Sequence, residues 1–247
     1  MEYSMSSPVW FSPIYSSKAQ ETKKWFGTSF KDVVDYPEYK KIEETYPRTD
    51  AQQQRYMQIL DAKIAFKNNY LDFRSIPKEN APTMMYGEEL RTDLHQFLPG
   101  FFKTLDSLVV TQECLDLLMQ FNLGEHIQFF PLPLYDLEKN ELVNHETYYV
   151  MSIADWRSFL MPEFCEGKLK KRQSLKAGYQ TYRLTVGDEF DNAIALSSEA
   201  SNCDLDLWHD PALKNSLFMS DRLKQALESA GFLANFHICA TKLVRKS

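Results

Sequence analysis

The sequence predicts an α+β fold in which a mixed β-sheet carries helices packed on it. Three observations support this class. Short apolar segments typical of strands alternate with amphipathic segments typical of helices. Two strand–helix–strand segments, 107–134 and 216–243, align with each other without a gap. The 247 residues are 44% hydrophobic and include 17 Phe and 13 Tyr, which is enough apolar material for a substantial core.

The first 104 residues are expected to form a mostly helical and loop-rich segment that packs on the rest of the chain. An early strand is predicted at 9–11, where three apolar residues follow each other. Thr49 and Asp50 predict the start of a helix whose apolar face carries Tyr56, Ile59, Leu60 and Ile64. A short strand is expected at 70–73, and a second helix at 87–98 ends before Pro99-Gly100.

Residues 105–247 form the predicted α+β region, either as a second domain or as the continuation of a single one. A strand and a capped helix are expected over 107–118, and an extended segment interrupted by prolines over 127–134. Further strands are predicted at 148–153, 179–186, 193–196 and 205–208. The basic stretch 168–176 is expected to be an exposed loop or turn.

The internal alignment pairs each residue of 107–134 with the residue 109 positions later. Thr111 and Ser220 both occupy the helix-cap position, and Leu118 corresponds to Leu227. Identities are few, so two explanations stay open: a repeated unit, or two generic strand–helix–strand segments. A repeat would place both units in one mixed sheet, with their helices on one side and both leucines buried.

The composition argues against several functional classes. The net charge is −6, so the basic excess of nucleic-acid-binding proteins is absent and no direct nucleic-acid contact is expected. Glycine is scarce, at 8 residues, and no phosphate-binding or dinucleotide motif occurs, so no cofactor is predicted. The N-terminus resembles no signal peptide and no apolar run reaches 18 residues, which predicts a cytoplasmic protein without a membrane segment.

Catalytic and metal-binding patterns are weak. The 4 cysteines and 5 histidines are scattered, without the spacing of a metal site, so no metal is predicted. Cys203 lies among acidic residues, which disfavour a nucleophilic thiolate. Ser220 is interpreted as a helix cap rather than as a nucleophile. An enzyme of unrecognised type, hydrolase-like with a dispersed site, is the alternative hypothesis.

Charge is unevenly distributed near the C-terminal half. Seven acidic residues and no Lys or Arg occur over 184–213, directly after a basic cluster at 168–176. These stretches are either solvated loops of opposite sign, which can pair with each other, or the acidic one faces a basic partner. Trp208 is either an aromatic interface anchor or a core residue. The predicted partner-binding residues are Asp188, Glu189, Asp191, Asp204, Asp206 and Trp208.

The segments TYRLTVGDEFDNAIALSS and DLDLWHDPALKNSLFMSDRLKQALESAGF resemble a family of bacterial immunity proteins from polymorphic toxin systems, named after a myxobacterial founding member. The shared feature is an apolar strand, Ser-Asp/Glu-x-Leu-x-x-x-Leu and a short final strand. Here it comprises Phe218-Met219, Ser220-Asp221-Arg222-Leu223 and Leu227, while QFFPLPLYD and HETYYVMSI resemble the central part.

The resemblance covers roughly residues 105–244 and implies a cytosolic protein that binds and neutralises one cognate toxin or effector. It transfers no catalytic residues to this chain. Because no signal peptide is recognised in this chain, the toxin that it neutralises is expected to act in the cytosol on nucleic acid, nucleotide or a cytosolic protein. The chemistry of the toxin, the surface that binds it, the oligomeric state and the role of the first hundred residues are not fixed by the sequence.

Overall fold

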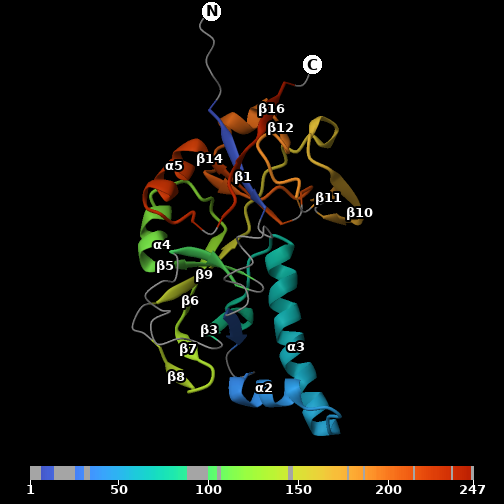
Figure 1. Cartoon of the computed structure of the whole chain (residues 1–247), viewed down its shortest axis with the longest axis vertical. Coiled ribbons are helices and arrows are strands. Elements are labelled where there is room, and N and C mark those ends of the chain that lie inside the picture. Colours follow the sequence, from blue (N-terminus) through green and yellow to red (C-terminus); the bar gives the residue numbers. More distant parts are fainter. Residues whose placement is uncertain are drawn as a thin grey trace, which may run out of the picture. The chain divides into compact units, whose positions relative to one another are not determined.

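A computed structural model describes residues 7–13, 26–30, 34–87, 100–104, 107–143, 147–176, 178–185, 187–213, 215–234 and 236–245. It combines helices with several antiparallel and mixed sheets, which confirms the α+β class (Figure 1). The chain divides into unit 1 (residues 1–21, 114–127 and 155–247) and unit 2 (residues 22–113 and 128–154). The expected boundary between residues 104 and 105 is therefore wrong, because strands pair across long sequence separations.

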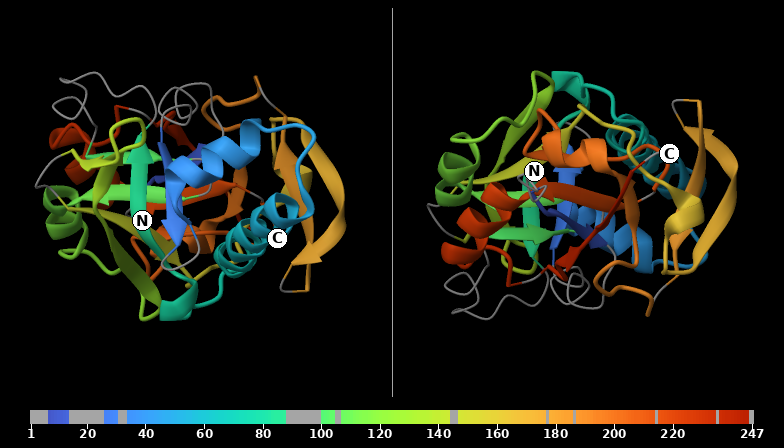
Figure 2. Two further views of the ribbon diagram at one scale, coloured as in Figure 1. Left: turned by 90° about the horizontal axis from the view of Figure 1, so that it is seen from below. Right: turned by 90° about the horizontal axis from the view of Figure 1, so that it is seen from above.

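Unit 1 is built on a four-stranded sheet with the order β13-β14-β1-β15. The N-terminal strand β1 lies between two C-terminal strands and is antiparallel to both. Two smaller sheets of two strands each complete the unit, and Figure 2 shows the β10–β11 pair as a ribbon. The strands are β1 Val9–Pro13, β10 Leu169–Lys176, β11 Tyr179–Leu184, β12 Ala195–Ser197, β13 Leu207–Trp208, β14 Ser216–Ser220, β15 Cys239–Ala240 and β16 Lys242–Val244.

Helix α5 (Asp221–Ser229) follows β14 directly in unit 1. The Leu223 N–H donates to the Ser220 Oγ at 3.3 Å, so Ser220 is the helix cap that the sequence predicted. Leu223 and Leu227 lie four residues apart and are both fully buried. The motif Ser-Asp-x-Leu-x-x-x-Leu therefore builds the fold: it starts the helix and supplies its buried face. Two short 3₁₀ turns, Pro162–Phe164 and Ser198–Asn202, also belong to this unit.

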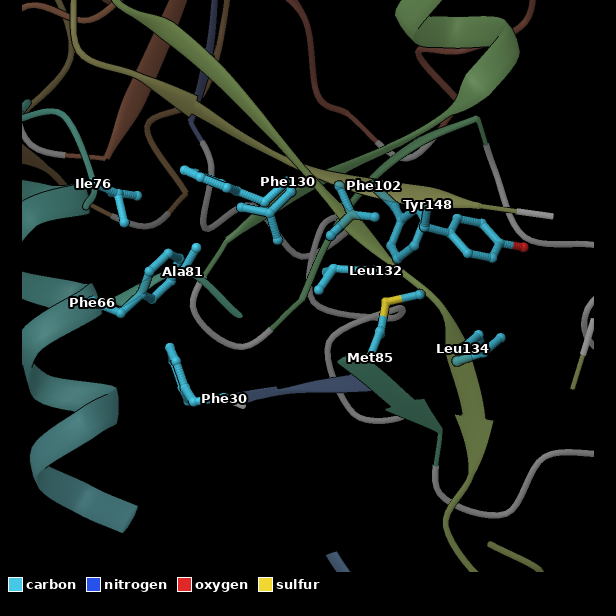
Figure 3. Close-up of a cluster of buried hydrophobic side chains, with 12 residues drawn as sticks. Phe30, Phe66, Ile76, Ala81, Met85, Phe102, Phe130, Leu132, Leu134 and Tyr148 are labelled. Atoms are coloured by element: carbon cyan, nitrogen blue, oxygen red, sulfur yellow. The ribbon is translucent and has the colours of Figure 1, made fainter. Parts of the chain in front are cut away.

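Unit 2 contains two four-stranded sheets, with the orders β2-β3-β7-β8 and β4-β5-β9-β6. Helices α2 (Tyr36–Glu44) and α3 (Asp50–Leu71) precede β3, and a 3₁₀ turn spans Lys78–Asn80. Side chains from α3 and from several strands converge on one buried cluster, which includes Phe66, Met85 and Tyr148 (Figure 3). The strands are β2 Phe26–Phe30, β3 Pro82–Gly87, β4 Phe101–Lys103, β5 Leu108–Thr111, β6 Ile127–Leu132, β7 Leu134–Asp136, β8 Glu141–Leu142 and β9 Tyr148–Ile153.

The two aligned segments share a helix and a strand order. Helix α4 (Gln112–Leu118) follows β5 as α5 follows β14, and the corresponding residues Leu118 and Leu227 are both fully buried. In each sheet, an antiparallel strand lies between the strands before and after the helix, giving β5-β9-β6 and β14-β1-β15. The two aligned segments nevertheless contribute to two different sheets, so the prediction of one shared sheet is wrong.

The strand registers extend this correspondence. Val109 pairs with Phe102 of β4 and with Val150 of β9, while the aligned Phe218 pairs with Trp208 of β13 and with Phe11 of β1. The inserted strand comes after the aligned segment in one case (β9) and from the N-terminus in the other (β1). The two four-stranded sheets therefore have the same topology in circularly permuted chain order, which favours a repeated unit over two generic segments.

Several local expectations differ from the structure. The strand expected at 70–73 is wrong, because α3 continues to Leu71. Of the apolar face expected on α3, Ile59 is fully buried but Ile64 is 51% exposed, so that expectation is wrong in part. Residues 168–176 were expected to form an exposed loop or turn, but 169–176 form β10, which pairs with β11 with a register shift between Lys171 and Leu175 and has no alternating pattern. The first 104 residues hold β1 to β4 as well as helices. The helix expected at 87–98 falls outside the described residues apart from Gly87, which ends β3. None of the helices described is long and apolar enough to cross a bilayer.

Candidate partner-binding surface

The six predicted partner-binding residues all lie in unit 1 but in three different environments. Asp188, Glu189 and Asp191 belong to one surface turn, and Asp204 lies on a separate exposed segment. Asp206 and Trp208 are only 2% and 1% exposed. The structure therefore brings three of the six together at the surface, and these three define what we call the acidic loop, residues 187–192.

Backbone hydrogen bonds hold each carboxylate of the acidic loop. The Asp188 Oδ2 accepts the Lys168 N–H at 3.2 Å, and the Asp191 Oδ1 accepts the Ala240 N–H at 2.8 Å. The Glu189 Oε2 accepts the Gly187 N–H at 2.7 Å. One oxygen of each carboxylate is thus tied to the main chain, while Asp191 is exposed and Asp188 and Glu189 are half-buried. This arrangement fixes the direction of the negative charge and limits the side-chain entropy lost on binding.

Phe190 lies in the middle of the acidic loop, and its side chain is 41% exposed. The turn is formed by two residues with positive φ, Gly187 (96°) and Asn192 (68°), which bracket the four residues between them. An exposed aromatic residue with acidic neighbours in the sequence combines the two elements of a protein-binding patch, an apolar anchor and charged neighbours. Sequence reasoning missed Phe190, although the phenylalanine in Asp-Glu-Phe-Asp-Asn interrupts an otherwise polar turn.

Asp204 is exposed, but its carboxylate forms an ion pair with Arg157. Its two carboxylate oxygens accept bonds from the Arg157 guanidinium at 2.8 Å and 2.5 Å, a bidentate arrangement. The Arg157 hydrogen bond lowers the pKa of Asp204 below its ordinary value, although burial alone would raise it. Since Arg157 neutralises this charge, Asp204 contributes little to a net negative surface.

Asp206 is an internal structural residue, so the prediction that it contacts a partner is wrong. Its carboxylate accepts the Ser220 hydroxyl at 2.5 Å, the Arg222 Nε at 2.6 Å and the Asn122 N–H at 2.9 Å. Burial on its own would raise the pKa of the Asp206 carboxyl, but hydrogen bonds from Arg222 and Ser220 lower it overall. The group ties the start of α5 to the segment around residue 122.

Trp208 is a core residue, which decides between the two interpretations of the sequence and excludes it as an exposed anchor. Its ring stacks on Phe218 with centroids 5.9 Å apart and an interplanar angle of 18°. Phe159 approaches it edge-on at 6.2 Å. The large ring therefore fills the centre of unit 1, on the β13–β14 pair.

The basic cluster next to the acidic stretch does not neutralise it. Lys168, Lys170, Lys171 and Arg172 are exposed, and among the described residues none has a carboxylate within ion-pair distance. The Lys168 backbone N–H contacts Asp188, but its ammonium group does not. The charges of the acidic loop are therefore not cancelled by ion pairs with these neighbouring cations.

Two cysteines and one histidine of unit 1 lie in surroundings that disfavour nucleophilic or acid–base chemistry. Burial raises the pKa of the Cys203 and Cys239 thiols to about 11, so both stay protonated at neutral pH. Burial lowers the pKa of His209 to about 4, and its Nδ1 donates to the Ser216 carbonyl at 2.9 Å. Within the part of the chain that the structure describes, no three His, Cys, Asp or Glu side chains gather as metal ligands.

Unit 2 has a pocket of about 380 Å³ beside α2 and α3. Asp35 and Asp136, the two described lining residues with carboxylates, accept hydrogen bonds from the main chain. The Asp35 Oδ1 accepts the Glu38 N–H at 3.0 Å, and the Asp136 Oδ1 accepts two backbone N–H groups. Among the described residues that line it there is no Ser, Cys, His or Lys. The lining residues are Val34, Asp35, Tyr36, Arg55, Met84, Tyr86, Tyr135, Asp136, Leu137 and Asn140.

Comparison of the chain with protein-family models and with curated protein sequences finds no match in either set. The resemblance to immunity proteins noted in the sequence therefore stays a prediction.

Proposed function

We propose that the chain is an immunity protein that binds a cognate antibacterial toxin in the cytoplasm and neutralises it by binding, without catalysis. The sequence resemblance over roughly residues 105–244 supports this proposal. The observation that carries it is the acidic loop, in which three carboxylates bonded to the main chain lie next to the exposed Phe190 in the sequence. A charged and partly apolar turn whose carboxylates are held by main-chain hydrogen bonds is suited to contact with a binding cleft.

The Ser-Asp-x-Leu-x-x-x-Leu motif, on which the resemblance to the family rests, does not supply the contact with the toxin. Ser220 caps α5, and Leu223 and Leu227 are buried, so these residues support the scaffold. Different toxins can then be bound by a common scaffold through surface loops, where most binding residues in proteins are found. The acidic loop is connected to this scaffold by the bond between the Ala240 N–H and Asp191.

The charge of the loop defines the expected partner. Enzymes that act on nucleic acids or nucleotides carry basic clefts, which bind phosphate groups. Carboxylates presented to such a cleft increase the association rate and occupy the position of the substrate phosphates. We therefore infer a toxin with a basic cleft, inhibited because the acidic loop blocks it, with Phe190 in an apolar recess near the cleft.

The proposal predicts a toxin gene beside the gene for this chain, and the test is protection against the product of that gene. Cells that co-express this toxin with the wild-type chain are expected to survive. A variant carrying Asp188→Asn, Glu189→Gln, Phe190→Ser and Asp191→Asn should fail to protect and should not co-purify with the toxin. The matched control, Glu79→Gln with Glu113→Gln and Glu141→Gln, removes three exposed negative charges outside unit 1 and should protect fully. Full protection by the loop variant would refute the acidic loop as the binding surface, and failure of the wild-type chain would refute immunity.

A further inference from the structure

The two-stranded ribbon of β10 and β11 is bonded to the rest of unit 1 along the β11 edge. The Tyr182 N–H donates to the Ala212 carbonyl at 2.7 Å, and Tyr182 forms a parallel bridge with Leu213. Along the outer edge of β10, no strand among the described residues pairs with the ribbon. β10 is therefore an edge strand, whose outer main-chain groups are available for pairing with another chain.

The register of the ribbon identifies the main-chain groups on this outer edge. The Thr185 N–H donates to the Lys168 carbonyl at 2.9 Å at the start of the ladder. Hydrogen-bonded and non-hydrogen-bonded pairs alternate along an antiparallel ladder, so the main-chain groups of Lys170 also point toward β11. Those of Leu169 and Lys171 point away from β11. Each of these two residues offers an N–H and a carbonyl to an added strand.

The side chains at this edge are cationic. Leu169 and Leu184 lie opposite each other and pack into the core of unit 1, so Lys170 and Arg183, the next pair, lie on the opposite face of the ribbon. Like charges directly opposite each other destabilise paired strands. Among the described residues, no carboxylate forms an ion pair with Lys170, Lys171 or Arg183. A repulsion that the single chain does not compensate indicates a function for the positive charge.

The surroundings of the ribbon distinguish between classes of anionic partner. The acidic loop is bonded to the start of β10, because the Lys168 N–H donates to the Asp188 Oδ2 at 3.2 Å, and the net charge of the chain is −6. A long polyanion such as a nucleic acid would extend past the few cations of the edge and be repelled by these carboxylates. A short acidic segment of a protein avoids this repulsion and also uses the main-chain groups of the edge.

We propose that the outer edge of β10 binds an extended acidic segment of a partner protein, which adds a strand to the ribbon. The main-chain groups of Leu169 and Lys171 pair with this segment, and its acidic side chains lie beside Lys170 and Lys171. Successive residues of a strand point to opposite faces, so two neighbouring acidic residues reach the two lysines. The acidic loop attracts a basic surface and this edge an acidic segment, so strand addition does not depend on the proposed function.

Binding of a synthetic peptide to the whole chain tests the proposal. The probe is a short acetylated peptide with consecutive glutamates flanked by valine and threonine, and binding is followed by calorimetry. We expect a dissociation constant of roughly 0.1–1 mM, because a short strand makes few contacts. Lys170→Gln with Lys171→Gln should weaken binding about three- to tenfold. The control, Lys41→Gln with Lys78→Gln, removes two exposed cations of unit 2 and should bind the peptide as wild type does.

Changes to the peptide test the two parts of the site on the unmodified chain. A peptide with glutamine in place of glutamate should bind about three- to tenfold more weakly, because the charge is lost. A peptide methylated at alternate main-chain amides should also bind more weakly, because it has lost donors to the edge. Equal binding of the methylated peptide would overturn strand addition. Tighter binding of a single-stranded RNA of equal charge, lost in Lys170→Gln with Lys171→Gln, would overturn the class of partner.

Acetylation of lysines in the whole chain tests whether the edge is accessible. Mass spectrometry should show Lys170 and Lys171 reacting about as fast as the exposed Lys78, and the glutamate peptide should slow the first two only. Protection of Lys170 and Lys171 in the free chain would overturn the proposal. So would the absence of binding to the glutamate peptide, or equal binding by wild type and a folded Lys170→Gln, Lys171→Gln variant.

Discussion

Replacing Asp206 by asparagine should destabilise the protein substantially without affecting toxin binding directly. The carboxylate is 3% exposed and accepts charge-assisted hydrogen bonds from Arg222, Ser220 and the Asn122 N–H. Asparagine keeps the shape but turns one acceptor oxygen into an NH₂ donor that faces other donors. A lost hydrogen bond to a charged group costs about 1.5–3 kcal/mol, and each buried group left unpaired adds a penalty. Arg222 is 67% exposed and regains water, which offsets part of the loss. We expect a net loss of about 3 kcal/mol in unfolding free energy.

Urea unfolding of matched variants checks this value. Arg222→Ala leaves the carboxylate its two other donors and should cost less, about 1–2 kcal/mol. Asp204→Asn is the control, because its side chain is 63% exposed and exposed ion pairs contribute about 0–1 kcal/mol. Since the folded pKa of Asp206 is lowered, its contribution is present above the unfolded value near 4 and is lost as pH falls through the folded pKa. The gap between wild type and Asp206→Asn should therefore shrink in acid. Equal stability at pH 7, or a gap that does not change with pH, would refute this assignment.

Three further predictions concern the core. Trp208→Ala should lower the unfolding free energy by about 3–5 kcal/mol in urea titrations, as loss of a buried aromatic ring does, and a folded variant that only binds more weakly would contradict the core assignment. Leu118→Ala and Leu227→Ala should each cost about 2–5 kcal/mol in the same assay, because the two residues occupy equivalent, fully buried positions, and a small effect at either would argue against the repeat. Because the folded pKa of His209 is about 4, the unfolded chain takes up its proton first, and stability should fall as pH drops from about 6.5 to 4. His209→Asn should flatten that part of the curve of unfolding free energy against pH, and an unchanged slope would show that His209 is not buried in the neutral form.

Local signals predicted the helix–strand units well. Helix α5 was expected because Ser220 and the spacing of Leu223 and Leu227 lie within one short segment, and the structure has the cap and both buried leucines there. The aligned Leu118 was expected to be buried for the same reason and is buried. Cap and periodicity are properties of neighbouring residues, so a single sequence carries them.

The features that the sequence did not predict depend on contacts between residues far apart in the chain. Asp206 lies between acidic and apolar neighbours, and its burial depends on Arg222, which is 16 positions away, and on Asn122, which is 84 positions away. The permuted strand order has the same origin, since β1 pairs with β14 more than 200 residues later. Strand β10 also escaped prediction, because its lysines and arginine do not alternate with apolar residues and pairing with β11 alone defines it.

In the proposed function, the acidic loop steers this protein to a basic toxin. The most direct measurement is the association rate with that toxin at low and at high salt, for wild type and for Asp188→Asn with Glu189→Gln and Asp191→Asn. Steering by three carboxylates should give wild type a rate about tenfold faster at low salt, and the advantage should disappear at high salt, where charges are screened within a few ångströms. The control with Glu79, Glu113 and Glu141 neutralised has the same net charge and should keep the wild-type rate and salt slope. An unchanged rate and salt slope in the folded loop variant would contradict the claim.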